Sequence, residues 1–513
     1  MRARPIVAAA IALLGAGALF NAADRDPEPT GCAAPYPFLA PLEPTALVLP
    51  GRGFGHGVGM SQWGARGAAL EGLDAEGILA HYYRGAEVAE GERRNVRVLL
   101  AEGEDSLTLS SQEPWRATGA GGEPEPLETG RDYRLTRAGE GFRLTDTVLG
   151  DTLDLAPPVA VAPVGDGPIS LEGRRYRGSF LLDDAEGGIR AVNEVDLEDY
   201  LRGVVPGEVP AGWGDDAPAA LQAQAIAARS YALATLVADE PFDLYADTRS
   251  QVYAGASAED PRTDLAVQAT EGRVLTSGGR VIVAYYSSSS GGHTEDGDRV
   301  FPADDPQPHL TGAEDPYDAI APLHRWPEPQ VFSDDEAAAR LDLEGRLTCL
   351  RPVELGASPR VLRAEGITAF PHYGRAELTG PRIRAALELP DTWFTPVRRR
   401  LSAGGGAVAP PPGAPRQDVW LAVLNASGVT GLAASTAERA EELGYRAVHA
   451  GNAPGGAGRS TALYRDGAEE AAERVASDLG LTRSAPLTSE ASVGEAPAGA
   501  QVVVVLRDDA PRP

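Results

Sequence analysis

Lysine is absent from the 513 residues, so all 46 basic side chains are arginines. Without a lysine amine the chain can form neither a lysine Schiff base nor a lysine nucleophile, which excludes two kinds of covalent catalysis. Cysteine is nearly absent as well, with only Cys32 and Cys349. Their number and spacing do not indicate a cysteine metal site, and a disulfide between them is permitted outside the cytoplasm without being implied.

Positive charge is also scarce relative to negative charge. The 74 acidic residues give the chain a formal net charge of -28. Such a field repels phosphate backbones, so we expect no nucleic-acid partner. The hydrophobic content of 43% is ample for packed cores, and the length suggests about three domains.

The N-terminus has the pattern of an export signal. Two arginines precede an apolar run from Ile6 to Leu19, which is too short to span a bilayer as a helix. Small residues follow, and we predict cleavage near Ala23, so that residues 1–23 form a signal peptide. The alternative is an uncleaved membrane anchor. In both cases the body is expected to be secreted or to lie in the cell envelope.

A Gly/Ala/Pro tract at residues 402–417 predicts a linker between a large body, 45–401, and a small tail, 418–509. The tail has the periodicity of a strand, helix, strand, strand, helix and strand. That βαββαβ order matches the split, ferredoxin-like arrangement. Because the tail shows no constellation of polar residues, we interpret it as a binding or spacing module.

The body is predicted to be α+β. It opens with a glycine-rich loop, GRGFGHGVGM, that contains His56 and leads into helices. Residues 95–188 read as short strands separated by turns, a β-rich subdomain. Residues 218–238 are alanine-rich and predict a buried helix. Arg229 lies in the middle of this helix, and it either pairs with a carboxylate that ties helix to sheet or orients a nearby functional group.

The stretch RGVVPGEVPAGWG sets Glu208 between two valine-proline steps. The preceding LEDYLRGV predicts one or two helical turns that Pro206 ends. Val204, Val205 and Val209 would desolvate the Glu208 carboxyl and raise its pKa toward that of a proton donor. The alternative is a surface glutamate that caps the next segment.

Four motifs together resemble the SpoIID/LytB family of peptidoglycan-acting proteins, over roughly residues 45–400. They are VNEVDLEDYLRGVVPGEVPAGW, AALQAQAIAARSYAL, YYSSSSGGHTED and GRGFGHGVGMSQWGARGAA. The resemblance implies a lytic transglycosylase in which Glu208 is the catalytic acid and Arg229 the family's helix arginine. Relatives often have a lysine where this chain has Gln222. The tail resembles the C-terminal domain of LytR-type cell-envelope proteins.

The resemblance also implies which residues bind the glycan. The glycine loop usually follows the other motifs in this family, whereas here it precedes them, so the same cleft would be completed from the N-terminal side. Some relatives hold zinc near the SSSSGGHTE segment, but serines stand at those positions here, and we predict no metal and no other cofactor. The expected substrate-binding residues are Arg229, Gln222, His56, Ser61, Gln62, Ser289, Gly291, Gly292 and His293.

One carboxylate suffices for the implied reaction, because a lytic transglycosylase uses the muramyl 6-hydroxyl of its own substrate as nucleophile. Ordinary glycosidases need two carboxylates. The expected partners are peptidoglycan glycan strands and other cell-wall hydrolases. A member of the LytB type would instead enhance an amidase without cutting glycan, and a third alternative is an inert envelope scaffold.

Overall fold

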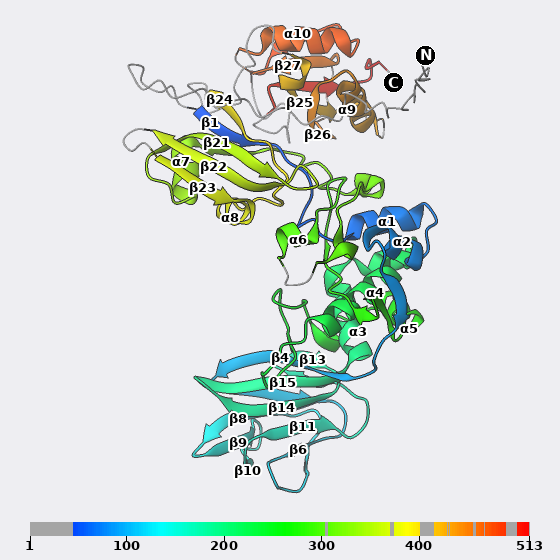
Figure 1. Cartoon of the computed structure of the whole chain (residues 1–513), viewed down its shortest axis with the longest axis vertical. Helices are drawn as coiled ribbons and strands as arrows, with labels where there is room; N and C mark the ends of the chain where they lie inside the picture. Colours follow the sequence, from blue (N-terminus) through cyan, green and yellow to red (C-terminus); the bar gives the residue numbers. More distant parts are fainter. Residues whose placement is uncertain are drawn as a thin grey trace, which may run out of the picture. The chain divides into compact units, whose positions relative to one another are not determined.

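The computed structural model describes residues 45–302, 306–369, 374–400, 415–427, 429, 431–454, 458–465, 467–488 and 500–511. The expected signal peptide, Cys32 and most of the expected linker lie outside the described residues. The described chain mixes helices and sheets, which confirms the α+β class (Figure 1). Within these ranges no helix is long and apolar enough to cross a bilayer.

The chain divides into two compact units, which are described separately. One unit comprises Met1–Pro50, Pro327–Glu336 and Thr395–Pro513, and the other comprises Gly51–Trp326 and Ala337–Phe394. The second unit is called the body unit below, and the first the tail unit.

The body unit contains a group of helices around one alanine-rich helix. The helices are α1 (Gln62–Leu70), α2 (Ala75–Tyr82), α3 (Leu197–Glu208), α4 (Pro218–Ala234) and α5 (Pro261–Ala269). Helix α4 contacts the other four. Most of its alanines are buried, because small side chains let the neighbouring helices approach closely. The side chains of Ser61, Asp74 and Asp196 cap α1, α2 and α3 by accepting hydrogen bonds from backbone amides.

Helix α3 does not end at Pro206, and this expectation was wrong. The helix continues to Glu208, and the backbone N–H of Val209 still donates to the Val205 carbonyl at 3.1 Å. Pro206 lies in the last turn, where its missing N–H removes only one hydrogen bond. The consequence is that Glu208 is the C-terminal residue of a helix rather than part of an irregular turn.

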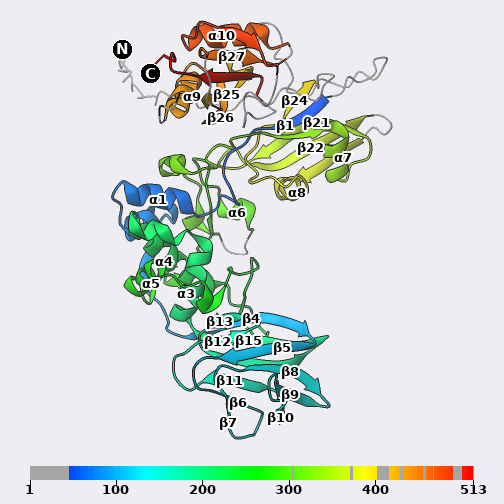
Figure 2. The same ribbon diagram turned by 180° about the vertical axis from the view of Figure 1, so that it is seen from behind.

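Two sheets form the β-rich subdomain (Figure 2). The first has the order β10-β9-β8-β5-β12-β13, with β5 (Ser106–Ser111), β8 (Asp132–Ala138), β9 (Gly141–Asp146), β10 (Thr152–Leu155), β12 (Ile169–Leu171) and β13 (Arg174–Tyr176). The second has the order β16-β4-β15-β14-β11-β6-β7, with β4 (Asn95–Glu104), β6 (Trp115–Thr118), β7 (Glu125–Leu127), β11 (Val159–Pro163), β14 (Ser179–Ala185), β15 (Gly188–Asp196) and β16 (Leu244–Tyr245). Trp115 of the second sheet packs edge to face on Tyr133 of the first, so the sheets share one core.

Short elements link the helices to the rest of the body unit. They are β2 (Met60–Ser61), β3 (Glu87–Glu90), β17 (Arg273–Ser277), β18 (Arg280–Val281), β19 (Tyr286–Ser287) and α6 (Gly297–Val300), with 3-10 turns η2 (Ala211–Asp215), η3 (Gly255–Ser257), η4 (Pro308–Leu310) and η5 (Pro316–Ile320). Strand β2 pairs in parallel with β19, with Met60 beside Tyr286. This pairing joins the glycine loop to a segment more than two hundred residues later in the sequence.

A three-stranded sheet completes the body unit. It contains β21 (Arg346–Leu355), β22 (Val361–Ala369) and β23 (Gly374–Thr379), followed by α8 (Gly380–Ala386). Cys349 is buried in β21. Helix α7 (Asp334–Arg340) precedes this sheet in the chain.

The tail unit contains a small sheet and the C-terminal domain. The sheet has the order β20-β1-β24, with β20 (Gln330–Ser333), β1 (Thr45–Leu49) and β24 (Val397–Arg400). Trp420, in the C-terminal domain, packs on Ala46 and Val48 of β1. The predicted boundary at residue 402 therefore does not coincide with the boundary of the compact units, because β1 and β24 group with the tail.

The C-terminal domain has the predicted series of elements with one further strand, β28, before the last one, and its topology differs from the predicted one. Its elements are η6 (Arg416–Asp418), β25 (Trp420–Asn425), α9 (Leu432–Glu442), β26 (Arg446–Asn452), β27 (Thr461–Tyr464), α10 (Glu469–Asp478), β28 (Ser484–Pro486) and β29 (Val502–Leu506). The sheet order is β26-β25-β29-β27-β28. A split, ferredoxin-like arrangement needs a strand between β25 and β26, but these two are parallel neighbours, so that expectation was wrong.

The apolar pattern of this sheet explains its order. Strand β29 is buried along its whole length, and β25 is buried except at its last residue, Asn425, so both lie inside the sheet. Helices α9 and α10 pack on one face of the sheet through alanines and Val475.

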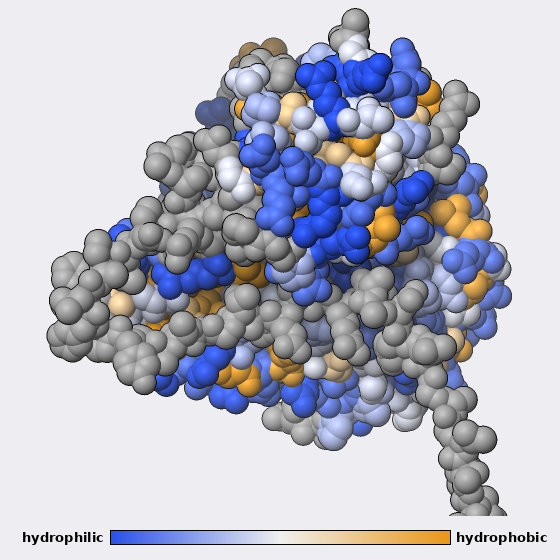
Figure 3. Space-filling view, turned by 90° about the horizontal axis from the view of Figure 1, so that it is seen from above, coloured by the Kyte–Doolittle hydropathy of each residue, from blue (hydrophilic) through white to orange (hydrophobic). Residues whose placement is uncertain are grey.

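Seen from above, the described surface is mainly hydrophilic, with hydrophobic residues scattered among charged ones (Figure 3).

Candidate functional site

The carboxyl of Glu208 is half-buried at the C-terminal end of α3. Burial raises the pKa of Glu208, which is the direction that its valine neighbours predict. Three neutral donors oppose that rise in pKa: the backbone of Val252, the hydroxyl of Tyr286 and the side-chain amide of Gln62. The carboxyl therefore lies among uncharged groups that can hold it in place without a cation.

Elements far apart in the sequence supply these three donors. Gln62 is the first residue of α1, Tyr286 is in β19, and Val252 is in the loop before η3. The pairing of β2 with β19 brings Gln62 and Tyr286 to the same place. The N-terminal glycine loop and the YYSSSSGG segment thus meet beside Glu208.

A buried polar layer supports Tyr286. Its hydroxyl accepts a hydrogen bond from the Gln251 side-chain amide at 2.8 Å. The Gln251 carbonyl oxygen in turn accepts from the Tyr200 hydroxyl at 3.2 Å. Burial raises the pKa values of Tyr200, Tyr231 and Tyr286, and the charge of Glu208 raises each of them further. These tyrosines are therefore neutral hydrogen-bonding groups around the carboxyl.

His56 contacts this layer from the glycine loop. Its Nδ1 accepts a hydrogen bond from the backbone N–H of Val58 at 3.0 Å, and its ring also bonds the backbone of Tyr286. Burial and the charges of Arg360 and Arg384 lower the pKa of His56 to about 4. His56 is therefore neutral at physiological pH and links the loop to the strand that carries Tyr286.

Ser61 and Ser289 point to a buried carboxylate rather than to Glu208. Both hydroxyls donate to Asp318, at 2.8 and 2.9 Å. The backbone N–H of Gly291 also donates to Asp318 at 3.0 Å, and His324 Nδ1 lies 2.9 Å from it. Asp318 is fully buried, and this shell satisfies it. These contacts fix the loop against η5.

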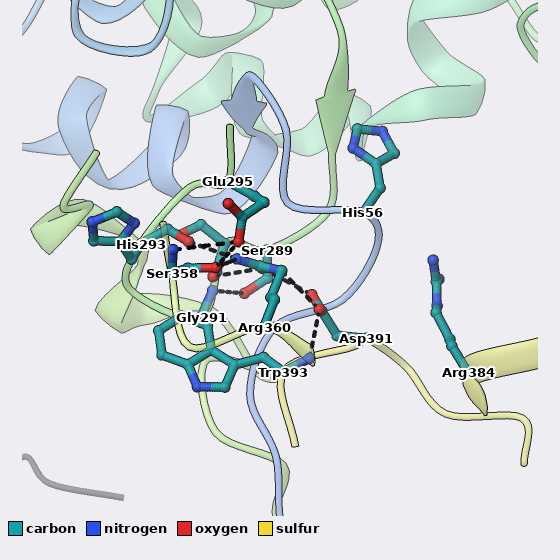
Figure 4. A network of polar contacts seen from close by, with 12 residues as sticks. His56, Ser289, Gly291, His293, Glu295, Ser358, Arg360, Arg384, Asp391 and Trp393 are labelled. Carbon is teal, nitrogen blue, oxygen red and sulfur yellow. Dashed lines mark hydrogen bonds and ion pairs between the residues drawn. The ribbon is translucent and has the colours of Figure 1, made fainter. Parts of the chain in front are cut away.

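The carbonyl groups of Ser290 and His293 bind a second buried centre, Arg360 (Figure 4). The guanidinium of Arg360 forms a two-pronged ion pair with Asp391, with both distances 2.9 Å. His293 itself holds its ring Nδ1 2.6 Å from the Thr294 carbonyl oxygen. Gly292 has a positive φ of 106°, and a Cβ there would lie 3.1 Å from His324. The segment from Ser289 to His293 is therefore held mainly by buried charges.

Gly57 makes the close packing of the loop around Arg360 possible. Its φ is +74°, and a Cβ at this position would lie only 2.2 Å from the Arg360 guanidinium carbon. Glycine alone combines this backbone conformation with so close an approach. The Figure 4 view shows His56 and Arg384 to one side of the dashed network around Arg360.

Arg229 forms an ion pair with Glu198 rather than with Glu208. Only 1% of its surface is exposed, and its guanidinium donates to both oxygens of Glu198 at 2.8 and 2.6 Å. It also donates to the Arg273 carbonyl at 3.0 Å. This arrangement ties α3, α4 and β17 together and leaves the guanidinium no free face toward Glu208. Gln222 is half-buried on α4.

The aromatic side chains of α1 and α2 differ in how far they are enclosed. Tyr82 and Tyr83 are buried and bond Asp315 and the Tyr285 carbonyl, so they cannot stack on a sugar. Trp63 is half-buried beside Trp213, with ring centroids 5.0 Å apart. Trp63 follows Gln62 directly, which keeps it a candidate for stacking.

Tyr286, Val252, Gln251 and Gln224 were not predicted as members of the site. Tyr286 belongs to a motif that the sequence singled out for its serines and glycines. Val252 and Gln251 lie in a loop whose sequence has no motif or periodicity that indicates a site. Among the described residues no group of three or more His, Cys, Asp or Glu side chains is arranged to hold a metal ion.

Comparison with known proteins identifies two domains. The model of the Stage II sporulation protein family, SpoIID, matches residues 185–277, which include Glu208 and Arg229. The model of the LytR cell envelope-related transcriptional attenuator family matches residues 418–509. No solved structure matches significantly.

Three curated relatives match parts of the chain. An uncharacterized protein of Brachyspira hyodysenteriae is 36% identical over 135 residues, 26% of this chain and 36% of that protein. The amidase enhancer of Bacillus subtilis is 40% identical over 136 residues, 26% of this chain and 18% of that protein. Stage II sporulation protein D of Bacillus subtilis is 31% identical over 173 residues, 30% of this chain and 49% of that protein. The chain spans about half the length of these relatives or less.

Proposed function

Because this chain carries a SpoIID-family domain and a C-terminal LytR-type domain, we propose that it remodels peptidoglycan outside the cytoplasm, as a lytic transglycosylase that cuts glycan strands. The observation that carries this proposal is the environment of Glu208. Its carboxyl is half-buried, its pKa is raised, and the groups that hydrogen-bond it are neutral. These are the properties of a residue that keeps a proton until a substrate needs it.

In the proposed reaction Glu208 serves first as acid and then as base. Protonated Glu208 gives its proton to the glycosidic oxygen, and the bond from that oxygen to the muramyl C1 breaks. The 6-hydroxyl of the same muramyl residue attacks C1 and gives its proton to the Glu208 carboxylate. The product is a 1,6-anhydro ring, and Glu208 is again protonated.

The neighbours of Glu208 have supporting roles in this proposal. Gln62 and Tyr286 hold the carboxyl in position, and His56 fixes the backbone of Tyr286. Gln222 and Trp63 are proposed to contact the sugar, because both are half-buried rather than fully enclosed. Ser61, Ser289, Gly291, Gly292 and His293 are proposed to shape the wall of the site. Arg229 is proposed to position α3 through Glu198 rather than to touch substrate.

We expect digestion of peptide-free glycan strands by the purified full chain to give fragments that end in 1,6-anhydro-muramic acid. The reason is that the proposed mechanism needs only the Glu208 carboxyl, whereas hydrolysis by the usual routes needs two carboxyls. Mass spectrometry of the products checks this expectation. Fragments with free reducing ends would show hydrolysis and would contradict the mechanism.

A second function is favoured by one of the relatives. The match to a protein named amidase enhancer supports a modulator that binds the wall and increases the activity of another hydrolase. The two functions separate in a simple assay. A modulator releases no fragments by itself but increases release when an amidase is added, and the Glu208→Gln variant keeps that effect.

The C-terminal domain is proposed to retain the protein at the wall. We expect removal of residues 402–513 to weaken sedimentation with insoluble peptidoglycan while leaving cleavage of soluble strands within about threefold, because each compact unit has its own core. The deletion also exposes Ala46 and Val48, which Trp420 covers. Cleavage and sedimentation assays check this expectation. Complete loss of cleavage on soluble strands, with the body unit still folded, would contradict it.

A further inference from the structure

Gln224 is a buried amide whose hydrogen bonding is incomplete. It lies on α4 between alanines, and only 1% of its surface is exposed. Its carbonyl oxygen lies 3.5 Å from the side-chain nitrogen of Gln62. Its own nitrogen is buried and has no hydrogen-bond partner among the described residues. A buried donor without an acceptor costs free energy, so this one needs an explanation.

The explanation lies in the protonation state of Glu208. In the arrangement described, the Gln62 amide nitrogen donates both to the Glu208 carboxyl and toward the Gln224 oxygen. This arrangement suits an ionised carboxylate, which only accepts hydrogen bonds. A carboxylic acid carries an O–H and needs an acceptor instead.

A half-turn of both amides supplies that acceptor. The oxygen and nitrogen of a side-chain amide exchange places when the group turns, with almost no change in shape. After the turn, the Gln62 oxygen accepts from the Glu208 O–H. The Gln224 nitrogen, which had no partner, then donates to the same Gln62 oxygen, and the Gln224 oxygen takes the buried place that has no partner.

We propose that Gln224 is a positioning residue that turns together with Gln62, so that the pair donates to ionised Glu208 and accepts from protonated Glu208. Each form leaves one polar atom of Gln224 without a partner, the nitrogen when Glu208 is ionised and the oxygen when it is protonated. The pair favours the protonated form, because buried N–H groups without an acceptor are rarer in proteins than buried carbonyl oxygens without a donor. This inference rests on the proposed function, in which Glu208 must keep its proton to act as an acid. Gln224 acts through Gln62 and does not touch the substrate.

Other titratable groups around Glu208 do not explain a preference for its protonated form. They are Tyr200 on α3, Tyr231 on α4 and Tyr286 on β19. Burial raises the pKa of each, so all three stay neutral over the pH range in which a glutamate titrates. Val252 offers only a backbone group. The Gln251 amide behind Tyr286 could also turn, but both of its polar atoms already have partners: its oxygen accepts from Tyr200, and its nitrogen donates to the Tyr286 hydroxyl and the Ala228 carbonyl. Gln62 and Gln224 are thus the pair in which a turn gives an unpaired buried nitrogen a partner.

The test is the pH dependence of glycan cleavage by the full chain carrying Gln224→Met. Methionine fills a similar volume but neither donates nor accepts in this way. We expect the alkaline limb of kcat/KM to move to lower pH, by less than about one unit, because the change removes the buried nitrogen that is unpaired only while Glu208 is ionised. The matched control is Gln268→Met, the same change at an exposed position on α5, which leaves the limb in place.

A second readout does not depend on activity. Carbon-13 NMR of labelled glutamate carboxyls follows the titration of Glu208, with its signal assigned by its loss in Glu208→Gln. Gln224→Met is expected to titrate at lower pH than the wild-type chain. Should that variant fail to fold, Gln224→Leu serves in its place.

The outcomes separate the inference from the proposed function. A downward shift of the Glu208 titration in a chain that cleaves no glycan would support the inference and contradict the proposed transglycosylase activity. If the chain cleaves glycan but Gln224→Met leaves the Glu208 titration unchanged, the inference is wrong and the proposed transglycosylase activity is unaffected. A lower melting temperature with no change in either titration would show a merely structural role and would also overturn it.

Discussion

Glu208→Gln is expected to keep the fold and to reduce glycan cleavage by about a hundredfold or more, because the amide cannot donate the proton that the leaving oxygen needs. Glutamine has nearly the shape of glutamate and can still meet the donors around it. The wild-type rate is expected to fall as the pH rises through the raised pKa of Glu208, since the acid form is then lost. Steady-state cleavage of soluble strands, with melting temperature as the check on folding, measures this effect.

The matched control is Glu186→Gln, the same change at an exposed turn after β14. It is expected to have wild-type activity, which shows that charge removal alone is harmless. If Glu208→Gln cleaves as fast as Glu186→Gln, Glu208 is not the acid. The modulator function would then be the better account.

Arg360→Met is expected to destabilise the body unit by about 3–5 kcal/mol, because it leaves a buried charge without its partner. Both side chains of the Arg360 and Asp391 pair are fully buried. The guanidinium also binds the carbonyls of Ser290 and His293, and Gly57 packs against it. Denaturant unfolding of the full chain measures the change in the free energy of unfolding. Cleavage should fall as well, since the loop that carries His56 loses its support.

Two variants make this expectation specific. Arg249→Met removes an arginine from an exposed pair with Asp247 and is expected to cost less than about 1 kcal/mol. The double variant Arg360→Met with Asp391→Leu removes both buried charges and is expected to recover much of the lost stability. Equal effects of Arg360→Met and Arg249→Met would contradict the importance of the buried pair.

The sequence predicts most of the local structure of this chain. The alanine-rich pattern predicts α4, and the alternating strands predict the β-rich subdomain, because both patterns are set by which side chains must be buried. The C-terminal series was predicted for the same reason. Its strand order was not, since pairing depends on contacts between distant residues that a periodicity does not encode.

The site was predicted only in part. The valines around Glu208 correctly indicate burial and a raised pKa. The role of Tyr286 depends on the pairing of β2 with β19, which no local pattern shows. Arg229 illustrates a different case: its charge left open either a carboxylate partner or a role in orienting a functional group, and the structure gives it Glu198 as a partner. Charged residues on small-residue helices predict a partner but do not say which one.

The most direct test of the account is digestion of peptide-free glycan in water enriched in heavy oxygen, followed by mass spectrometry of the new chain ends. A lytic transglycosylase closes the ring with the 6-hydroxyl of the substrate, so the account predicts anhydro ends that carry no heavy oxygen in the wild-type digest and no new ends with Glu208→Gln. Heavy oxygen in the new muramyl ends would show that water is the nucleophile and would contradict the account.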